Sequence, residues 1–149
     1  MSSERIPPLK AVMTPFPWAV ESDAPLDRAR ELMASHEVRH LPVTDTHRLV
    51  GIITDRDLRR LLGSRLANGG VGGDGADGLL VSDAMTTDIY TVDLNTPLDH
   101  ALTVMAEEHL GCTLVTRDDR LAGILTSTDV CRLYAAQLGR LRPHGDDVA

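Results

Sequence analysis

Aromatic residues and long apolar runs are both scarce in this sequence. Phe, Trp and Tyr together make up 3% of its 149 residues, so the chain offers no series of rings on which the bases of single-stranded nucleic acid could stack. No segment approaches the roughly 20 apolar residues that a membrane span requires. Residues 1–9 lack the charged-then-apolar order of a signal peptide. We therefore expect a cytoplasmic protein that does not bind membranes.

Positive charge is also in short supply. Lysine and arginine total 15 against 22 acidic residues, which gives a formal net charge of −7. Generic nucleic-acid binding requires a basic surface, so this balance argues against a nucleic-acid partner. It still leaves room for a few arginines around one phosphate group.

Cysteine occurs only twice, at Cys112 and Cys131. Two cysteines in a chain without a secretory signal do not suggest a disulfide framework. Their spacing from His109 fits no zinc-ligand pattern, so no metal site is expected. The sequence favours buried, reduced thiols, with a thiol- or metal-dependent regulator as an alternative.

What the sequence does have is a globular composition and an internal repeat. Hydrophobic residues make up 42% and charged residues 25%, which is typical of a soluble folded domain. Met13-Thr14 recurs as Met85-Thr86, and the same offset relates Pro25-Leu26-Asp27 to Pro97-Leu98-Asp99. Between residues 12–62 and 84–134, about 19 of 51 aligned pairs are identical without a gap. The chain is therefore a duplicated unit.

Each copy predicts the same order of secondary structure. A proline suited to the first turn of a helix precedes apolar residues at helical spacing, beginning at Leu26 and at Leu98. Two β-rich runs follow, at 41–44 and 49–54 in one copy and at 113–116 and 121–126 in the other. A second helix begins after them. The order strand, helix, strand, strand, helix predicts an α/β (α+β) unit whose small sheet needs the second copy to cover it.

The end of each unit carries its most informative motif. It reads Gly-Ile-Ile-Thr-Asp-Arg-Asp from Gly51 and Gly-Ile-Leu-Thr-Ser-Thr-Asp from Gly123. A threonine before a helix with an aspartate three residues later is a variant of the capping box, and capping alone is a sufficient role for either motif. The same geometry suits a ligand, because the free N–H groups of a helix N-terminus attract phosphate and a nearby carboxylate can accept ribose hydroxyls.

These motifs together resemble the CBS domain, named for cystathionine β-synthase. They are M-T, P-L-x-x-A, R-H-L-P-V and G-I-I-T-x-x-D, in that order, and the second copy departs from them mainly at R-H-L-P-V. The resemblance extends from about Ala11 to Tyr134 and implies a stand-alone Bateman module, a tandem CBS pair packed with pseudo-two-fold symmetry. We expect CBS repeat 1 at 8–62, a glycine-rich linker at 63–79, CBS repeat 2 at 80–138 and a C-terminal tail at 139–149.

The resemblance also implies a ligand and its contacts. Paired CBS domains typically bind adenosine ligands (AMP, ADP, ATP or S-adenosylmethionine) in clefts between the repeats, with the aspartate on the ribose and basic residues near the phosphates. Carried over to this sequence, the main cleft combines Thr126, Asp129, Arg39, His40 and Arg56.

A second cleft follows from the same correspondence. It combines Thr54 and Asp57 with Gly111 and Cys112, which stand where the first repeat has the basic pair Arg39-His40. Because Gly111 and Cys112 offer no positive charge to a phosphate, we expect this cleft to bind more weakly.

The expected function is regulatory sensing of an adenine nucleotide. The sequence shows no nucleophile beside a base and no paired carboxylates outside the ribose motifs, so neither catalysis nor a required cofactor is expected. The partners implied are the nucleotide, a second copy in a homodimer and an unidentified regulated protein. The alternative is a structural protein-interaction domain with vestigial clefts, in which both T-x-x-D motifs are only helix caps.

Overall fold

Both repeats follow the predicted order of elements. The computed structural model describes residues 5–67 and 78–143. The first repeat has β2 at Val20–Glu21, α2 at Leu26–His36, β3 at His40–Asp45, β4 at Arg48–Thr54 and α3 at Asp55–Ala67. The second has β5 at Thr91–Asp93, α5 at Leu98–Glu107, β6 at Cys112–Arg117, β7 at Arg120–Thr126 and α6 at Ser127–Arg140. The predicted α/β fold with two β-α-β-β-α units is confirmed.

The last helix of each repeat runs further than the sequence suggested. α3 continues to Ala67, inside the segment predicted to be linker, and α6 continues to Arg140, past the predicted end of repeat 2. A glycine inside a helix costs only about 1 kcal/mol relative to alanine, and Gly63 accordingly does not end α3. The other predicted linker residues at 68–77, and the tail residues 144–149, lie outside the described residues.

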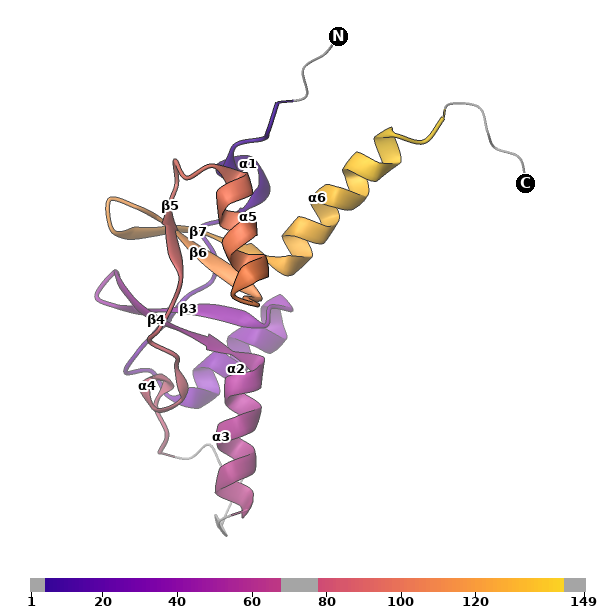
Figure 1. The fold of residues 1–149 in the computed structure, drawn as a ribbon. Helices are drawn as coiled ribbons and strands as arrows, with labels where there is room; N and C mark the ends of the chain where they lie inside the picture. The colour runs from indigo at the N-terminus through magenta and orange to yellow at the C-terminus, as the bar shows by residue number, and fades with distance from the viewer. Residues whose placement is uncertain (1–4, 68–77, 144–149) are drawn as a thin grey trace, which may run out of the picture.

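Each repeat contributes a small mixed half-sheet, and the two halves join at their equivalent strands β4 and β7 into one seven-stranded sheet. β2 is parallel to β3 and β3 is antiparallel to β4, an arrangement that β5, β6 and β7 reproduce. Thr46-His47 and Asp118-Asp119 close the two hairpins with positive φ at both positions, as type I′ turns require. β4 and β7 pair antiparallel at Arg48 and Arg120, which places them at the centre of the molecule (Figure 1).

The two faces of each sheet are buried against different neighbours. Successive side chains of a strand point to opposite faces, so Ile53 joins the core under the helices of repeat 1 while Ile52 packs toward repeat 2. Leu125 and Ile124 divide in the same way in the second repeat. A third apolar cluster, containing Ile52, Leu114 and Ile124, therefore holds the repeats together.

A short segment before each repeat packs on the other repeat. Helix α1 (Leu9–Val12) and strand β1 (Thr14–Pro15) precede repeat 1, yet Leu9 is buried in the core of repeat 2 and β1 pairs with β7. Helix α4 (Val81–Ala84) precedes repeat 2, yet Val81 is buried in the core of repeat 1. Figure 1 shows α1 beside α5 in the upper half and α4 in the lower half. The motifs and periodicity of the sequence do not predict this exchange.

Glycines in the central strands make room for the exchanged segments. A Cβ atom added at Gly51 would lie 2.8 Å from the carbonyl oxygen of Thr86, and one added at Gly123 would lie 3.0 Å from that of Thr14. The first distance is shorter than real Cβ atoms show and the second is tighter than most of them show, so glycine in the G-I motif favours this close backbone approach.

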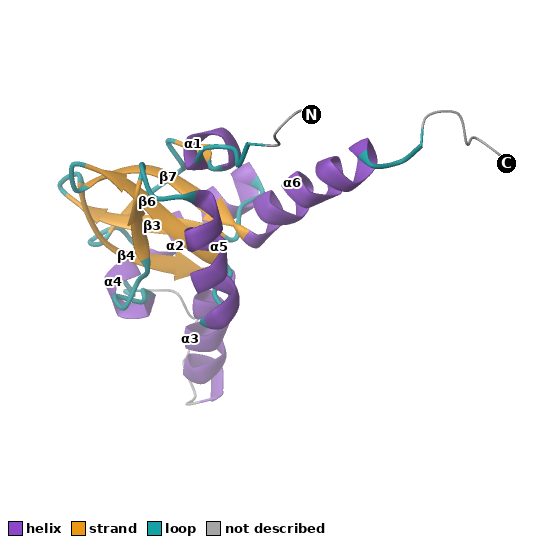
Figure 2. Cartoon of the chain, turned by 45° about the horizontal axis from the view of Figure 1, so that its top comes forward, coloured by secondary structure: helices purple, strands orange, loops and turns teal. Residues whose placement is uncertain are grey.

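Helix α6 leads away from the rest of the molecule. Figure 2 shows the strands gathered together with α2 and α5 beside them, whereas α3 runs downward and α6 runs outward from the strands. None of the α6 residues is buried. Among the described residues, no helix is long and apolar enough to cross a membrane.

Candidate functional site

Thr54 and Asp57 form a complete capping box at the start of α3. The Thr54 backbone N–H and hydroxyl both donate to Oδ2 of Asp57, at 3.0 and 2.9 Å. In return, the Asp57 N–H donates to the Thr54 hydroxyl oxygen at 3.1 Å. All the bonds that Asp57 accepts here fall on Oδ2, so its second carboxylate oxygen is left as an acceptor for a ligand.

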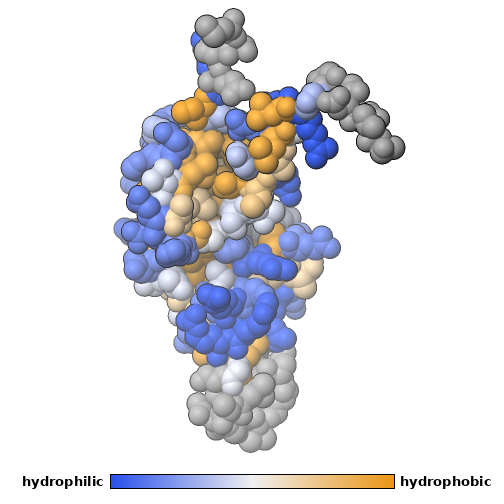
Figure 3. Space-filling view, turned by 45° about the vertical axis from the view of Figure 1, so that its right-hand side comes forward, coloured by the Kyte–Doolittle hydropathy of each residue, from blue (hydrophilic) through white to orange (hydrophobic). Residues whose placement is uncertain are grey.

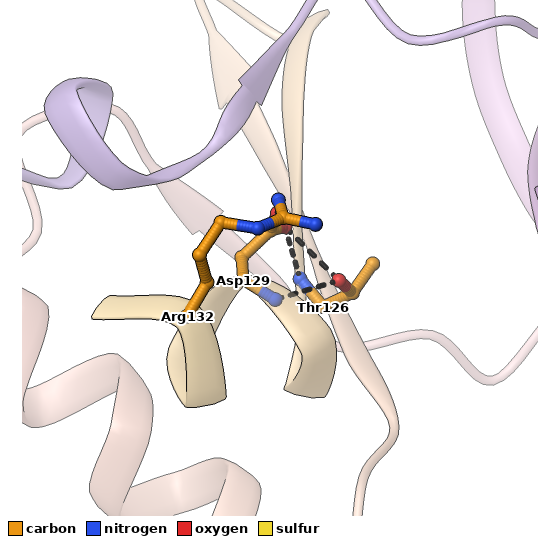
Figure 4. Close-up of polar contacts among 3 residues, drawn as sticks. All are labelled: Thr126, Asp129 and Arg132. Carbon is orange, nitrogen blue, oxygen red and sulfur yellow. Dashed lines mark hydrogen bonds and ion pairs between the residues drawn. The ribbon is translucent and has the colours of Figure 1, made fainter. Parts of the chain in front are cut away.

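Thr126 and Asp129 repeat this geometry at the start of α6. The corresponding distances are 2.9, 3.0 and 3.2 Å, and Figure 4 shows the three bonds together with Arg132 above the carboxylate. Arg132 lies 3.8 Å from Oδ1 of Asp129. The capping role is thus fulfilled in both repeats, and the second oxygen of Asp129, unlike that of Asp57, has a cation beside it.

A depression of about 580 Å³ opens in front of the first capping box. We call it the Asp57 depression. It is lined by both repeats, and the residues that matter for its chemistry are Arg39, His40, Ile52, Thr54, Arg56, Asp57, Tyr90, Gly111, Cys112 and Leu114. Its size falls in the range of small-molecule sites.

The structure groups the site residues differently from the sequence expectation. The four residues of the expected second cleft, Thr54, Asp57, Gly111 and Cys112, do line one depression. The basic residues expected in the main cleft, Arg39, His40 and Arg56, line the same depression, whereas Thr126 and Asp129 are not among its lining residues.

Strand register explains this grouping. In the β3–β4 hairpin His40 and Thr54 are directly opposite each other, and the Asp55 N–H donates to the Arg39 carbonyl at 3.0 Å. The basic pair therefore lies next to the aspartate motif of its own repeat. The sequence correspondence had assigned the pair to the opposite repeat.

The depression also includes residues that the sequence did not indicate. Ile89 and Tyr90 follow the exchanged segment of α4 and reach the depression because Thr86 pairs with Ile52 of β4. The repeat offset relates Tyr90 to Trp18, but this correspondence does not show which repeat either residue faces. Only the exchange seen in the structure places Tyr90 beside Asp57.

His40 bridges the two repeats within the depression. A Cβ atom added at Gly111 would lie 3.4 Å from Nε2 of His40, so the imidazole of repeat 1 reaches van der Waals distance of the backbone position that precedes β6. Burial lowers the pKa of His40, the neighbouring Arg39 lowers it further, and Asp57 raises it in opposition. A neutral imidazole is thus favoured when no anion is bound.

Two arginines supply uncompensated positive charge. Arg59 is hydrogen-bonded to Asp55, but among the described residues neither Arg39 nor Arg56 has an ion pair. Both side chains are exposed at the depression. Together with a ribose acceptor at Asp57, they make an arrangement suited to a phosphorylated nucleoside.

The cysteines differ in environment, which corrects the expectation that both are buried. Cys112 is half-buried, and burial raises its pKa to about 11. Cys131 is exposed, because it lies on the outward helix α6. Within residues 5–67 and 78–143, no group of three or more histidine, cysteine or acidic side chains could hold a metal ion. A protonated Cys112 thiol is also a poor nucleophile and metal ligand.

The chain belongs to the CBS domain family. The family model matches residues 9–64 and 81–136, which together include nearly all of both repeats. A tandem CBS pair, expected from the motifs, is confirmed.

Solved CBS pairs with bound adenosine ligands share this fold. The CBS domain pair of protein MJ0100, in complex with methylthioadenosine and S-adenosyl-L-methionine, has a TM-score of 0.74 and 27% identity, covering 89% of this chain and 99% of that one. CBSX2 in complex with AMP has a TM-score of 0.72 and 31% identity, covering 89% and 98%. Adenosine ligands are therefore bound by homologous pairs.

Enzyme relatives match this chain only over part of their length. L-aspartate semialdehyde sulfurtransferase of Methanocaldococcus jannaschii is 27% identical over 131 residues, which is 87% of this chain but 23% of that protein. The chain thus spans about a quarter of the length of that relative. The match covers a CBS portion of that larger enzyme.

Proposed function

We propose that this protein is a regulatory sensor that binds a phosphorylated adenosine ligand in the Asp57 depression. The observation that carries the proposal is the convergence, in one depression, of a nearly buried carboxylate and two arginines that have no ion pair within residues 5–67 and 78–143. Asp57 is 8% exposed. The sequence predicted the main ligand site at Asp129 and a weaker one at Asp57. We propose that the main site is the one at Asp57 and the weaker site the one at Asp129.

Each part of the ligand has a partner in the depression. The second oxygen of Asp57 accepts from the ribose hydroxyls, while Thr54 holds the carboxylate in place through the capping box. The phosphate lies toward Arg39 and Arg56, with His40 as a further donor. The base rests on the apolar floor formed by Ile52 and Leu114.

The apolar floor lies where ligand binding can change the packing of the two repeats. Ile52 and Leu114 belong to the apolar cluster that packs one repeat against the other. A ligand that contacts both residues stabilises one packing of the repeats over others, and a partner protein can respond to that packing. This mechanism requires only the free energy of ligand binding, so we propose no catalytic step.

The proposal is tested first by calorimetric titration of the purified protein with AMP, ADP, ATP, S-adenosylmethionine and methylthioadenosine. We expect saturable binding of at least one phosphorylated ligand, and tighter binding of AMP than of methylthioadenosine, because only AMP carries a phosphate for the arginines. GMP is the control for base selection.

The outcome that contradicts the proposal is the absence of binding by all five ligands. That result would favour the alternative of a structural interaction domain, for which the complete capping boxes at Thr54 and Thr126 supply a sufficient structural role for both motifs.

The partner expected from the sequence, a second copy, has a candidate surface on α6. Tyr134 and Leu138 of α6 are 59% and 47% exposed and lie one turn apart on the same face of the helix, and the C-cap residue Leu141 is 68% exposed. Figure 3 shows apolar residues gathered on the upper half of one face of the molecule. We infer that a homodimer buries this face of α6. Analytical ultracentrifugation of a Leu138→Glu variant tests the inference, because the variant should lose the dimer.

A further inference from the structure

A hollow larger than the Asp57 depression lies apart from it on the described part of the molecule. It has a volume of about 970 Å³ and lies between the α1–β1 segment and the β6–β7 hairpin. A neighbouring hollow of about 660 Å³ extends it, because both are lined by Lys10, Leu94 and Arg117. We call the two together the hairpin groove. It has no lining residue in common with the Asp57 depression.

Large apolar side chains stand exposed at both ends of this groove. Phe16 is 87% exposed at one end and Ile6 is 63% exposed at the other. Phe16 also has a positive φ of 44°, a conformation that is unfavourable for a bulky residue. Its N–H donates to the Ala122 carbonyl at 3.1 Å. The fold therefore holds an aromatic ring in solvent by means of a strained backbone, which is typical of a binding surface.

The groove also collects positive charge at the point where the two repeats differ. In repeat 1 the end of the hairpin pairs Asp45 with Arg48, whereas in repeat 2 the equivalent positions pair Arg117 with Arg120. Arg120 is also opposite Arg48 across the β4–β7 pair. Three arginines thus occupy neighbouring strand positions, and like charges placed opposite each other destabilise a sheet.

None of these arginines has an ion pair among the described residues. Arg117 and Arg120 line the groove with Lys10 and with the acidic residues Asp118 and Asp99, whereas Arg48 lies outside its lining. The net charge of the chain is −7, so the positive charge of this cluster is opposite in sign to the overall charge. An arrangement that costs stability, in an acidic protein, indicates attraction of an external anion.

We propose that the hairpin groove docks a segment of another protein in which acidic residues flank a large apolar side chain. The apolar side chain lies against Phe16, Met13 and Leu121, and the acidic residues pair with Arg117, Arg120 and Lys10. An elongated groove with exposed apolar residues at each end fits a length of chain better than a compact small molecule. The net negative charge elsewhere repels such a segment, so the groove is where it binds.

The test selects random twelve-residue peptides displayed on phage against the full chain. We expect the selected peptides to be enriched in aspartate or glutamate next to phenylalanine, leucine or tryptophan. Affinities of the synthetic peptides are then measured by fluorescence polarisation. Binding should weaken by at least about tenfold in Arg117→Asp, which reverses one charge, and in Phe16→Asn, which removes the ring but tolerates positive φ.

The variants are chosen so that a failure to fold does not explain a loss of binding. Arg117→Asp restores the opposite-charge pairing that Asp45 and Arg48 have in repeat 1, so its melting temperature should be no lower than that of the wild type. Arg140→Asp makes the same charge reversal on the exposed end of α6 and should bind the peptides as the wild type does.

Three results would overturn the proposal. They are enrichment of basic or uncharged peptides, enrichment of none, and binding that Arg117→Asp leaves unchanged. If no peptide is enriched, the protein is also sedimented with phosphatidylglycerol vesicles. Sedimentation that Arg117→Asp abolishes would then assign the groove to a lipid surface instead.

Discussion

At the scale of single residues, Thr113 is a polar side chain in an apolar environment. It is fully buried in β6, and its hydroxyl has no hydrogen-bond partner among the described residues. Repeat 1 has Leu41 at the equivalent position, also fully buried. An unpaired buried hydroxyl costs about 1–3 kcal/mol, so repeat 2 carries a local destabilisation that repeat 1 lacks.

Replacing this hydroxyl by a methyl group should therefore stabilise the protein. We expect Thr113→Val to raise the free energy of unfolding by about 1 kcal/mol, measured by urea denaturation. Thr116→Val is the matched control, because the Thr116 hydroxyl donates to the Val92 carbonyl and its removal should bring no gain. Equal effects of the two substitutions would show that Thr113 has a partner in solution.

His40 gives the free protein a pH dependence with a defined sign. Its pKa is lowered by burial and by Arg39 from the ordinary value of 6.5 that the unfolded chain retains. Below that pH the unfolded state binds the proton more readily, so the contribution to stability is complete above about 6.5 and is lost as the pH falls toward the folded pKa.

The corresponding prediction concerns the change in unfolding free energy between pH 7 and pH 5. Replacing His40 by glutamine should make this decrease smaller than in the wild type, whereas His100→Gln, on the exposed surface of α5, should leave it unchanged. The profiles are measured by thermal or urea denaturation at each pH. A wild-type profile in His40→Gln would show that burial of the imidazole is not coupled to folding.

At the scale of elements, the exchanged segments tie the two repeats together. β1 pairs with β7, and Thr86 pairs with Ile52 of β4, so each repeat is completed by chain that precedes the other. Because Thr86 approaches Gly51 so closely, a single methyl group added at Gly51 would disturb this packing. Stability of one repeat therefore depends on the other.

A substitution at Gly51 tests this dependence. Gly51→Ala should lower the free energy of unfolding by about 1–3 kcal/mol, the usual cost of overpacking, because the added Cβ meets a backbone carbonyl rather than a flexible side chain. Gly63→Ala, inside α3 with nothing within 4 Å, should instead stabilise the protein by up to about 1 kcal/mol. A neutral Gly51→Ala would mean that the segment detaches easily.

The sequence predicted the elements well because both repeats carry the same periodicity. The helices after Pro25 and Pro97 and the paired strands follow from local patterns, which two copies confirm for each other. It could not predict that Leu9 and Val81 pack on opposite repeats, because periodicity indicates that a side chain is buried but not against what. The grouping of His40 with Asp57 depends on strand register, which is likewise a property of the folded hairpin.

At the scale of the whole molecule, the two repeats are related but not equivalent. Among the described residues, Arg39 and Arg56 beside Asp57 have no ion pair, whereas Asp129 has Arg132 beside its second oxygen. The hairpin ends differ as well, since the described hairpin of repeat 2 opposes two arginines and that of repeat 1 opposes Asp45 and Arg48. The duplication thus supplies a symmetric framework whose two sides carry different side chains.

The measurement that tests the central claim most directly is calorimetric titration of AMP into Asp57→Ala and Asp129→Ala side by side. The two substitutions remove the same pair of hydrogen bonds, from the threonine N–H and hydroxyl to the carboxylate, so they control for each other's structural effect. We predict that Asp57→Ala abolishes AMP binding while Asp129→Ala retains it. Loss of binding in Asp129→Ala with wild-type affinity in Asp57→Ala would contradict the account.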